Sequence, residues 1–110
     1  MEYNFGYDFT KTAEADLSEI VSYIAVALGN RQAASDWLDE LQKKIDETRL
    51  FPESGMAVEN EFLPIDGIRR KLVGNYIMYY IPDTDKQMIH VLRIVYGKRN
   101  LDEIMRELHK

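Results

Sequence analysis

The sequence contains no cysteine, which excludes disulfide bonds, cysteine-ligated metal centres and thiol nucleophiles. Its two histidines, His90 and His109, do not lie at the spacing of a His-x-x-x-His metal site. No apolar run approaches the roughly 18 residues that a membrane span needs, and the N-terminus lacks the basic and apolar regions of a signal peptide. We therefore expect a soluble, cytoplasmic protein with no cofactor, no bound metal and no membrane partner.

Sequence motifs for several kinds of catalysis are also missing. There is no glycine-rich phosphate loop and no nucleophile elbow. Asp83-Thr84-Asp85 begins like a calcium loop, but the glycine and distal glutamate of such a loop do not follow, so a turn is predicted. For His90, a half-exposed position in a strand is favoured over the role of a catalytic base.

What the chain does have is enough apolar sequence for one folded domain over residues 1–110, since 45% of its 110 residues are hydrophobic and 11% aromatic. Its net charge of −5 is unevenly spread. Residues 1–66 hold five Lys or Arg against fourteen Asp or Glu, whereas residues 67–110 hold nine against five. This asymmetry indicates either that the basic half has an anionic partner or that the two halves meet each other.

The first half of the chain predicts a strand followed by two helices. Aromatic residues at every second position of 3–9 indicate an edge strand. Apolar residues at helical spacing over 13–28 then predict a helix that Thr10 or Thr12 caps and Gly29-Asn30 ends. A second amphipathic helix begins at about Gln32, and Pro52 prevents it from continuing.

The second half of the chain predicts strands and a last helix. Residues 56–66 have no clear period and are expected to form a loop. Three β-rich runs follow at 68–73, 76–81 and 88–96, with short connections that demand antiparallel neighbours. A short helix after Asn100 completes the order β-α-α-β-β-β-α. The fold class is therefore α+β, an N-terminal strand and a helical hairpin packed on a small antiparallel sheet whose other face is open to water.

Cations and tyrosines gather on the predicted strands. Alternation puts Arg69 and Lys71 on one face of their strand and Arg70 on the other. Neighbouring strands bring further cations within reach of one anion, and arginine suits phosphate because its planar fork donates two parallel hydrogen bonds. Tyrosines on the last two strands can stack bases, although packing in or around the core is favoured for most of them.

The chain resembles the RelE/ParE superfamily of toxins from bacterial type II toxin–antitoxin systems. The resemblance is carried by Leu-Phe-Pro-Glu-Ser-Gly at 50–55, Gly-Ile-Arg-Arg at 67–70, Val-Gly-Asn-Tyr at 73–76 and Leu-Arg-Ile-Val-Tyr-Gly-Lys-Arg-Asn at 92–100. It implies a growth inhibitor encoded by a plasmid-stabilisation module and neutralised by a cognate antitoxin protein. RelE-like members cleave mRNA on the ribosome, whereas ParE-like members poison DNA gyrase.

The last two of these motifs are more similar to the ParE branch, so gyrase is the favoured target. An arginine of the nuclease branch falls on Tyr76 in this chain, and a tyrosine of its C-terminal helix falls on Met105. A ribosome-dependent endoribonuclease and a degenerate, non-toxic interaction module remain as alternatives.

The resemblance also implies roles for individual residues. Under the nuclease alternative the catalytic residues are Arg69, Arg93, Tyr96 and Arg99. The residues expected to bind nucleic acid or the target are Arg70, Lys71, Tyr76 and Lys98. The residues expected to bind the antitoxin are Met78, Ile104, Met105 and Leu108.

Overall fold

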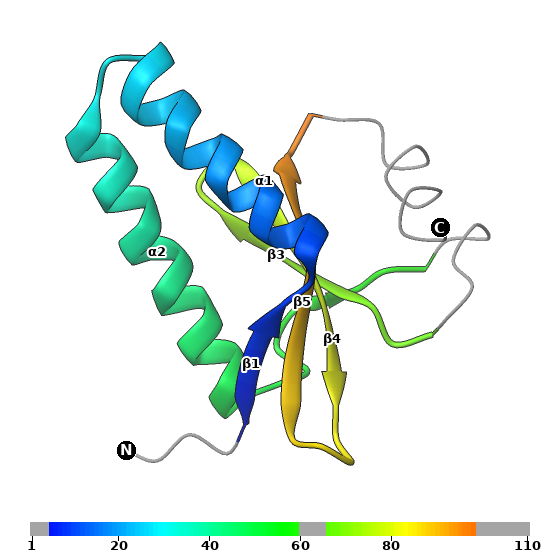
Figure 1. Cartoon of the computed structure of the whole chain (residues 1–110). Coiled ribbons are helices and arrows are strands. Elements are labelled where there is room, and N and C mark those ends of the chain that lie inside the picture. The colour runs from blue at the N-terminus through cyan, green and yellow to red at the C-terminus, as the bar shows by residue number, and fades with distance from the viewer. Residues whose placement is uncertain (1–4, 60–65, 99–110) are drawn as a thin grey trace.

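A layer of two helices covers one face of a five-stranded sheet in the computed structural model, which describes residues 5–59 and 66–98 (Figure 1). The helical elements are α1 (Lys11–Ser22), the π-helix η1 (Tyr23–Ala27) and α2 (Arg31–Leu50). The strands are β1 (Gly6–Phe9), β2 (Met56–Ala57), β3 (Arg69–Val73), β4 (Tyr76–Asp83) and β5 (Met88–Tyr96). They lie in the order β1-β5-β4-β3-β2. The α+β fold class is thus confirmed.

The ends of the helices follow the predicted signals. The Thr10 hydroxyl accepts a hydrogen bond from the Ala13 amide at the start of α1, and Asn30 caps α2 in the same way through Ala33. Between them the backbone turns at Gly29, whose φ of +63° is a conformation that glycine adopts without strain. One feature was not predicted: α1 runs directly into η1, where the Leu28 amide donates to the Tyr23 carbonyl five residues back.

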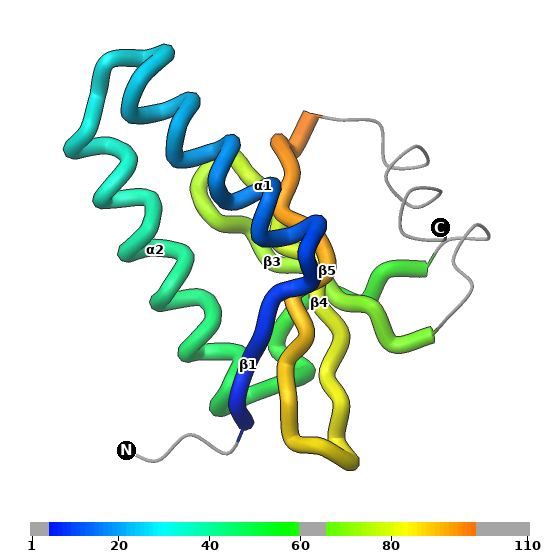
Figure 2. The backbone as a smooth tube through the Cα atoms, in the orientation of Figure 1, coloured from blue at the N-terminus to red at the C-terminus, as the bar shows by residue number. Residues whose placement is uncertain are grey.

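The sheet is mixed, whereas the sequence predicted an antiparallel one. β3, β4 and β5 are antiparallel neighbours, and Gly74-Asn75 forms the tight turn between β3 and β4. β1, however, pairs with β5 in parallel, with Asp8 opposite His90. Figure 2 shows how the chain returns through β5, the last strand in the described residues, to lie beside β1.

The segment after α2 contains a short strand where the sequence predicted only a loop. Met56 and Ala57 form β2, which pairs with Arg70 and Arg69 of β3. A two-residue strand has no periodicity to detect, and its position is fixed by the neighbour with which it pairs. β2 therefore covers only the first two residues of the outer edge of β3.

Both faces of the sheet are buried at its centre. The main core lies between the helices and the sheet and includes Trp37, Ile45 and Tyr80. The opposite face was expected to be open to water, but its central residues Ile77 and Tyr79 are at most 8% exposed. The helix predicted after Asn100 lies outside the described residues.

Candidate functional site

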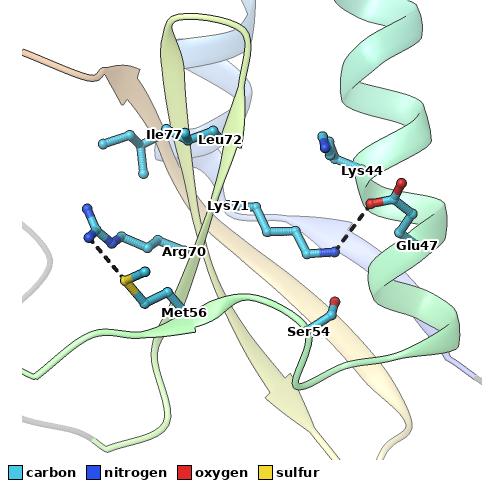
Figure 3. A pocket seen from close by; sticks show the side chains of 8 residues that line it. All are labelled: Lys44, Glu47, Ser54, Met56, Arg70, Lys71, Leu72 and Ile77. Carbon is cyan, nitrogen blue, oxygen red and sulfur yellow. Dashed lines mark hydrogen bonds and ion pairs between the residues drawn. The ribbon is translucent and has the colours of Figure 1, made fainter.

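Three consecutive cations on β3 form the centre of the candidate site. Arg70 and Lys71 extend to opposite sides of the strand, as the predicted alternation requires (Figure 3). Lys71 extends toward α2 and pairs with Glu47, with 3.8 Å between Nζ and Oε2. Arg69 also lies on the side of Lys71 and binds the turn before β2. The strand thus divides its charge between two surfaces.

Lys71 is largely enclosed by its neighbours. Its side chain is 10% exposed, and this burial lowers its pKa. Glu47 opposes that shift, while the positive charge of Lys44 adds to it. Lys44 and Glu47 were not predicted as site residues, because charged residues on one face of an amphipathic helix normally indicate a surface exposed to solvent.

Arg69 is engaged in holding the chain in place. Its guanidinium donates to the backbone carbonyls of Glu53 and Gly55, at 3.0 and 2.7 Å. The same turn is held from the core side by the Tyr80 hydroxyl, which donates to the Pro52 carbonyl and accepts from the Gly55 amide. Arg69 therefore acts here as a structural side chain.

A cavity of about 450 Å³ lies along the outer edge of β3. Its lining combines cations with exposed apolar side chains, of which Met56 is 63% and Leu72 65% exposed. β2 pairs only with Arg69 and Arg70, so residues 71–73 have no partner strand on this side within the described part of the chain. We call this surface the β3 edge; it is lined by Lys44, Glu47, Ser54, Met56, Arg70, Lys71, Leu72 and Ile77.

The predicted catalytic residue Arg93 lies elsewhere and is buried. Its guanidinium donates to the carboxylate of Asp16 through two nitrogens, at 2.8 and 3.0 Å. The charge of Arg93 is thus matched by a carboxylate on α1, and its catalytic role under the nuclease alternative stays a prediction. The sequence gives no sign of the pairing, since the two residues are 77 positions apart.

The other predicted site residues are spread over the molecule. Tyr76 packs between Trp37 and Tyr96 at the far end of the sheet, and Lys98 is exposed beyond the end of β5. Met78 is fully buried in the main core, so it offers no exposed surface, and its role as an antitoxin contact stays a prediction. Four predicted residues lie outside the described ranges: Arg99, Ile104, Met105 and Leu108.

His90 has two carboxylate partners that the sequence reading missed. Its Nδ1 lies 2.6 Å from Asp8 and its Nε2 3.3 Å from Asp83. The Asp8 hydrogen bond, with a smaller contribution from Asp83, raises the pKa of His90, although partial burial opposes it. Asp8 is 82 positions away in sequence, so only the parallel pairing of β1 with β5 reveals the cluster.

The described residues do not meet the requirements of a metal site or of a membrane-spanning helix. Within residues 5–59 and 66–98, no group of three His, Asp or Glu side chains is arranged to hold a metal ion. Neither helix in those ranges combines the length and apolarity that crossing a membrane requires.

Comparisons with known proteins agree with this architecture. Residues 7–101 match the family model described as the ParE toxin of the type II toxin-antitoxin system, parDE. No curated protein matches the chain by sequence.

Three solved structures are similar in fold. The chromosomal ParDE system of P. aeruginosa superposes with a TM-score of 0.66 at 17% identity, covering 88% of this chain and 100% of the other. The RelBE2 toxin–antitoxin complex of Mycobacterium tuberculosis gives 0.58 at 17% identity, with 84% and 98% covered. The isolated E. coli RelE toxin gives 0.58 at 15% identity, with 94% and 98% covered.

Proposed function

The chain belongs to the ParE toxins of type II toxin–antitoxin systems, and from this premise we propose that it inhibits growth by acting on DNA gyrase. The observation that carries the proposal is the arrangement of the cations. Cleavage of RNA develops negative charge on phosphate and requires groups that move protons, so cations must converge on one point. In this chain Arg93 is matched by Asp16, and Arg69 by backbone carbonyls.

The positions of the side chains that could move protons, His90 and Tyr96, also support a protein target. His90 lies near the start of β5, between Asp8 and Asp83, whereas Tyr96 is the last residue of that strand. The six residue steps from His90 to Tyr96 along β5, at about 3.3 Å each, separate the two by roughly 20 Å. A toxin that binds a protein needs no such constellation.

The experiment is pulse labelling after induced expression of the whole chain in bacteria. Thymidine incorporation should fall before amino-acid incorporation, and the purified protein should inhibit DNA supercoiling by gyrase. Tyr96→Phe and Arg99→Ala should both stay toxic, with Lys86→Ala in the exposed β4–β5 turn as the control. Loss of an acid–base group costs a nuclease about 100-fold or more in rate. An arrest of protein synthesis within minutes that either variant abolishes would overturn the proposal in favour of the ribosome-dependent endoribonuclease.

The β3 edge is the surface that we assign to the cognate antitoxin. An extended segment can pair with the free edge at residues 71–73, while its apolar side chains cover Met56 and Leu72. Acidic side chains on the same segment would then meet Arg70, whose guanidinium donates to the sulfur of Met56 at 3.3 Å. Such a partner combines backbone pairing, apolar contact and charge.

The variant Leu72→Asp tests this assignment. It places a carboxylate in the middle of the apolar contact, so antitoxin affinity should fall about tenfold or more, as expected for losing a buried leucine. Toxicity should persist when the antitoxin is co-expressed. Val26→Asp is the matched control, because Val26 is 77% exposed and lies on the helical layer. If Val26→Asp weakens the complex and Leu72→Asp does not, the antitoxin lies elsewhere.

A further inference from the structure

A second cavity, of about 580 Å³, lies where the tip of the helical layer meets the β3–β4 turn. Four of its lining residues are aromatic: Tyr23, Trp37, Tyr76 and Tyr96. None of the described side chains that line it carries a charge. We call this site the aromatic cavity, and the toxin function proposed above does not use it.

The inner wall of the aromatic cavity is held rigidly. The Trp37 indole N–H donates to the Val73 carbonyl at 3.0 Å, which fixes the ring in the core. Tyr76 follows, with its ring centroid 5.4 Å from that of Trp37 and 5.7 Å from that of Tyr96. The ring planes meet at 67° and 57°, so the rings form angled walls and not a parallel stack. The turn fits closely against this wall, because a Cβ on Gly74 would lie 3.3 Å from Trp37.

The outer rim of the cavity is open to solvent. Tyr23 is 52% and Tyr96 45% exposed, so both rings can contact a ligand without rearrangement of the core. Tyr23 belongs to the π-helix η1, and π-helical turns concentrate at functional sites. Burial raises the pKa of Tyr76, and the neighbouring phenols of Tyr23 and Tyr96 raise it further.

The aromatic lining of the cavity favours a cation over an anion. The faces of aromatic rings attract positive charge, and no cation in the described lining would repel it. A nucleic acid would need cations against its phosphates, and the described lining supplies none.

We propose that the aromatic cavity binds the guanidinium of an arginine side chain on a partner protein. A planar guanidinium can lie against the angled rings and donate to the phenol oxygens at the rim, which an ammonium does less well. The site is separate from the β3 edge. Its occupant does not depend on whether the toxin acts on gyrase, so this inference and the proposed function can fail independently.

Binding at this site can be followed without a label, because Trp37 is the only tryptophan of the chain and gives a single indole N–H resonance. The probe is the peptide acetyl-Gly-Arg-Gly-amide, added to the full-length protein while the indole N–H resonance of Trp37 is followed by NMR. The comparison is the same peptide with citrulline, which keeps the planar shape but has no charge. The arginine peptide should shift the resonance saturably and bind about two- to fivefold more tightly than the citrulline peptide.

Variants at the rim localise the binding. Tyr96→Leu and Tyr23→Leu should each weaken the arginine peptide about two- to fivefold. Phe51→Leu is the matched control, since Phe51 is an aromatic side chain that is 68% exposed and does not line the cavity. Equal binding of both peptides, an unshifted Trp37 resonance, or a tighter response to adenosine monophosphate would overturn the proposal.

Discussion

Asp16 joins helix α1 to the centre of the sheet through one carboxylate. It accepts two hydrogen bonds from the Arg93 guanidinium and a third from the Ile94 amide, at 2.9 Å. Beyond the end of β1, the outer edge of β5 has no neighbouring strand among the described residues, and Asp16 satisfies a backbone donor there. The Asp16 and Arg93 side chains are 11% and 10% exposed, so both charges have lost most of their water. A pair of this kind is costly to break on one side only.

Asp16→Ala should therefore lower the free energy of unfolding by about 3 kcal/mol, because the Arg93 guanidinium stays buried without its carboxylate. Urea unfolding followed by circular dichroism measures the change. Glu14→Ala is the control, since Glu14 is an exposed carboxylate on the same helix. Replacing both members, as Asp16→Leu with Arg93→Met, should recover part of the loss. If Asp16→Ala and Glu14→Ala unfold at the same urea concentration, the pair does not stabilise the fold.

At the scale of the element, local signals predicted the long helices and the β3–β4 hairpin, and pairing over long distances decided the rest. Thr10 and Gly29 mark the two ends of the first helical segment because capping and left-handed turns depend mainly on residue type and the residues next to it. The parallel direction of β1 could not be predicted in the same way, since its alternation of aromatic side chains fits either direction.

The candidate site was predicted less well than the fold for the same reason. The alternation of Arg70 and Lys71 follows from β geometry, and the structure agrees with it. Whether a cation is free to bind a ligand depends on what faces it from other elements. Lys71 faces Glu47 on α2 and Arg93 faces Asp16 on α1, and no local pattern records either partner.

At the scale of the whole molecule, these pairings explain the uneven charge of the chain. The basic second half was expected either to bind an anion or to meet the acidic first half. Lys71–Glu47, Arg93–Asp16 and His90–Asp8 each join a basic side chain of the second half to a carboxylate of the first. Part of the charge asymmetry therefore serves to hold the two halves together. Arg70 differs from Lys71, because it extends from the opposite side of β3, away from α2 (Figure 3).

The cluster around His90 closes the fold, because it ties β1 to the β4–β5 hairpin. Protonated histidine donates from both ring nitrogens and satisfies Asp8 and Asp83 together, whereas neutral histidine donates from only one. The charged groups that face His90 are thus the two carboxylates, with Lys86 near Asp83. The raised pKa of His90 means that the folded state holds its proton more tightly than the unfolded chain does.

The sign of the pH dependence follows from that difference. The contribution of His90 to stability is fully present below its unfolded pKa of 6.5 and is lost as the pH rises through the higher folded value. Asp83 has the opposite pH dependence. Its pKa is lowered, chiefly by the hydrogen bond from the Lys86 amide and then by His90. Its contribution to stability is therefore present above the unfolded pKa of 3.8 and is lost as the pH falls below it. Stability from this cluster is therefore greatest between about pH 4 and 6.5.

The free energy of unfolding should accordingly fall between pH 6 and pH 8.5 by up to about 1 kcal/mol, the range for a partly exposed ion pair. Urea unfolding at a series of pH values measures it. His90→Gln and Asp8→Asn should each flatten this slope, because each removes the linkage between protonation and folding. His109 lies outside the described residues, and His109→Gln is the matched control, which should leave the slope unchanged. A slope that survives in His90→Gln and disappears in His109→Gln would assign the titration to the other histidine and contradict the role of the cluster.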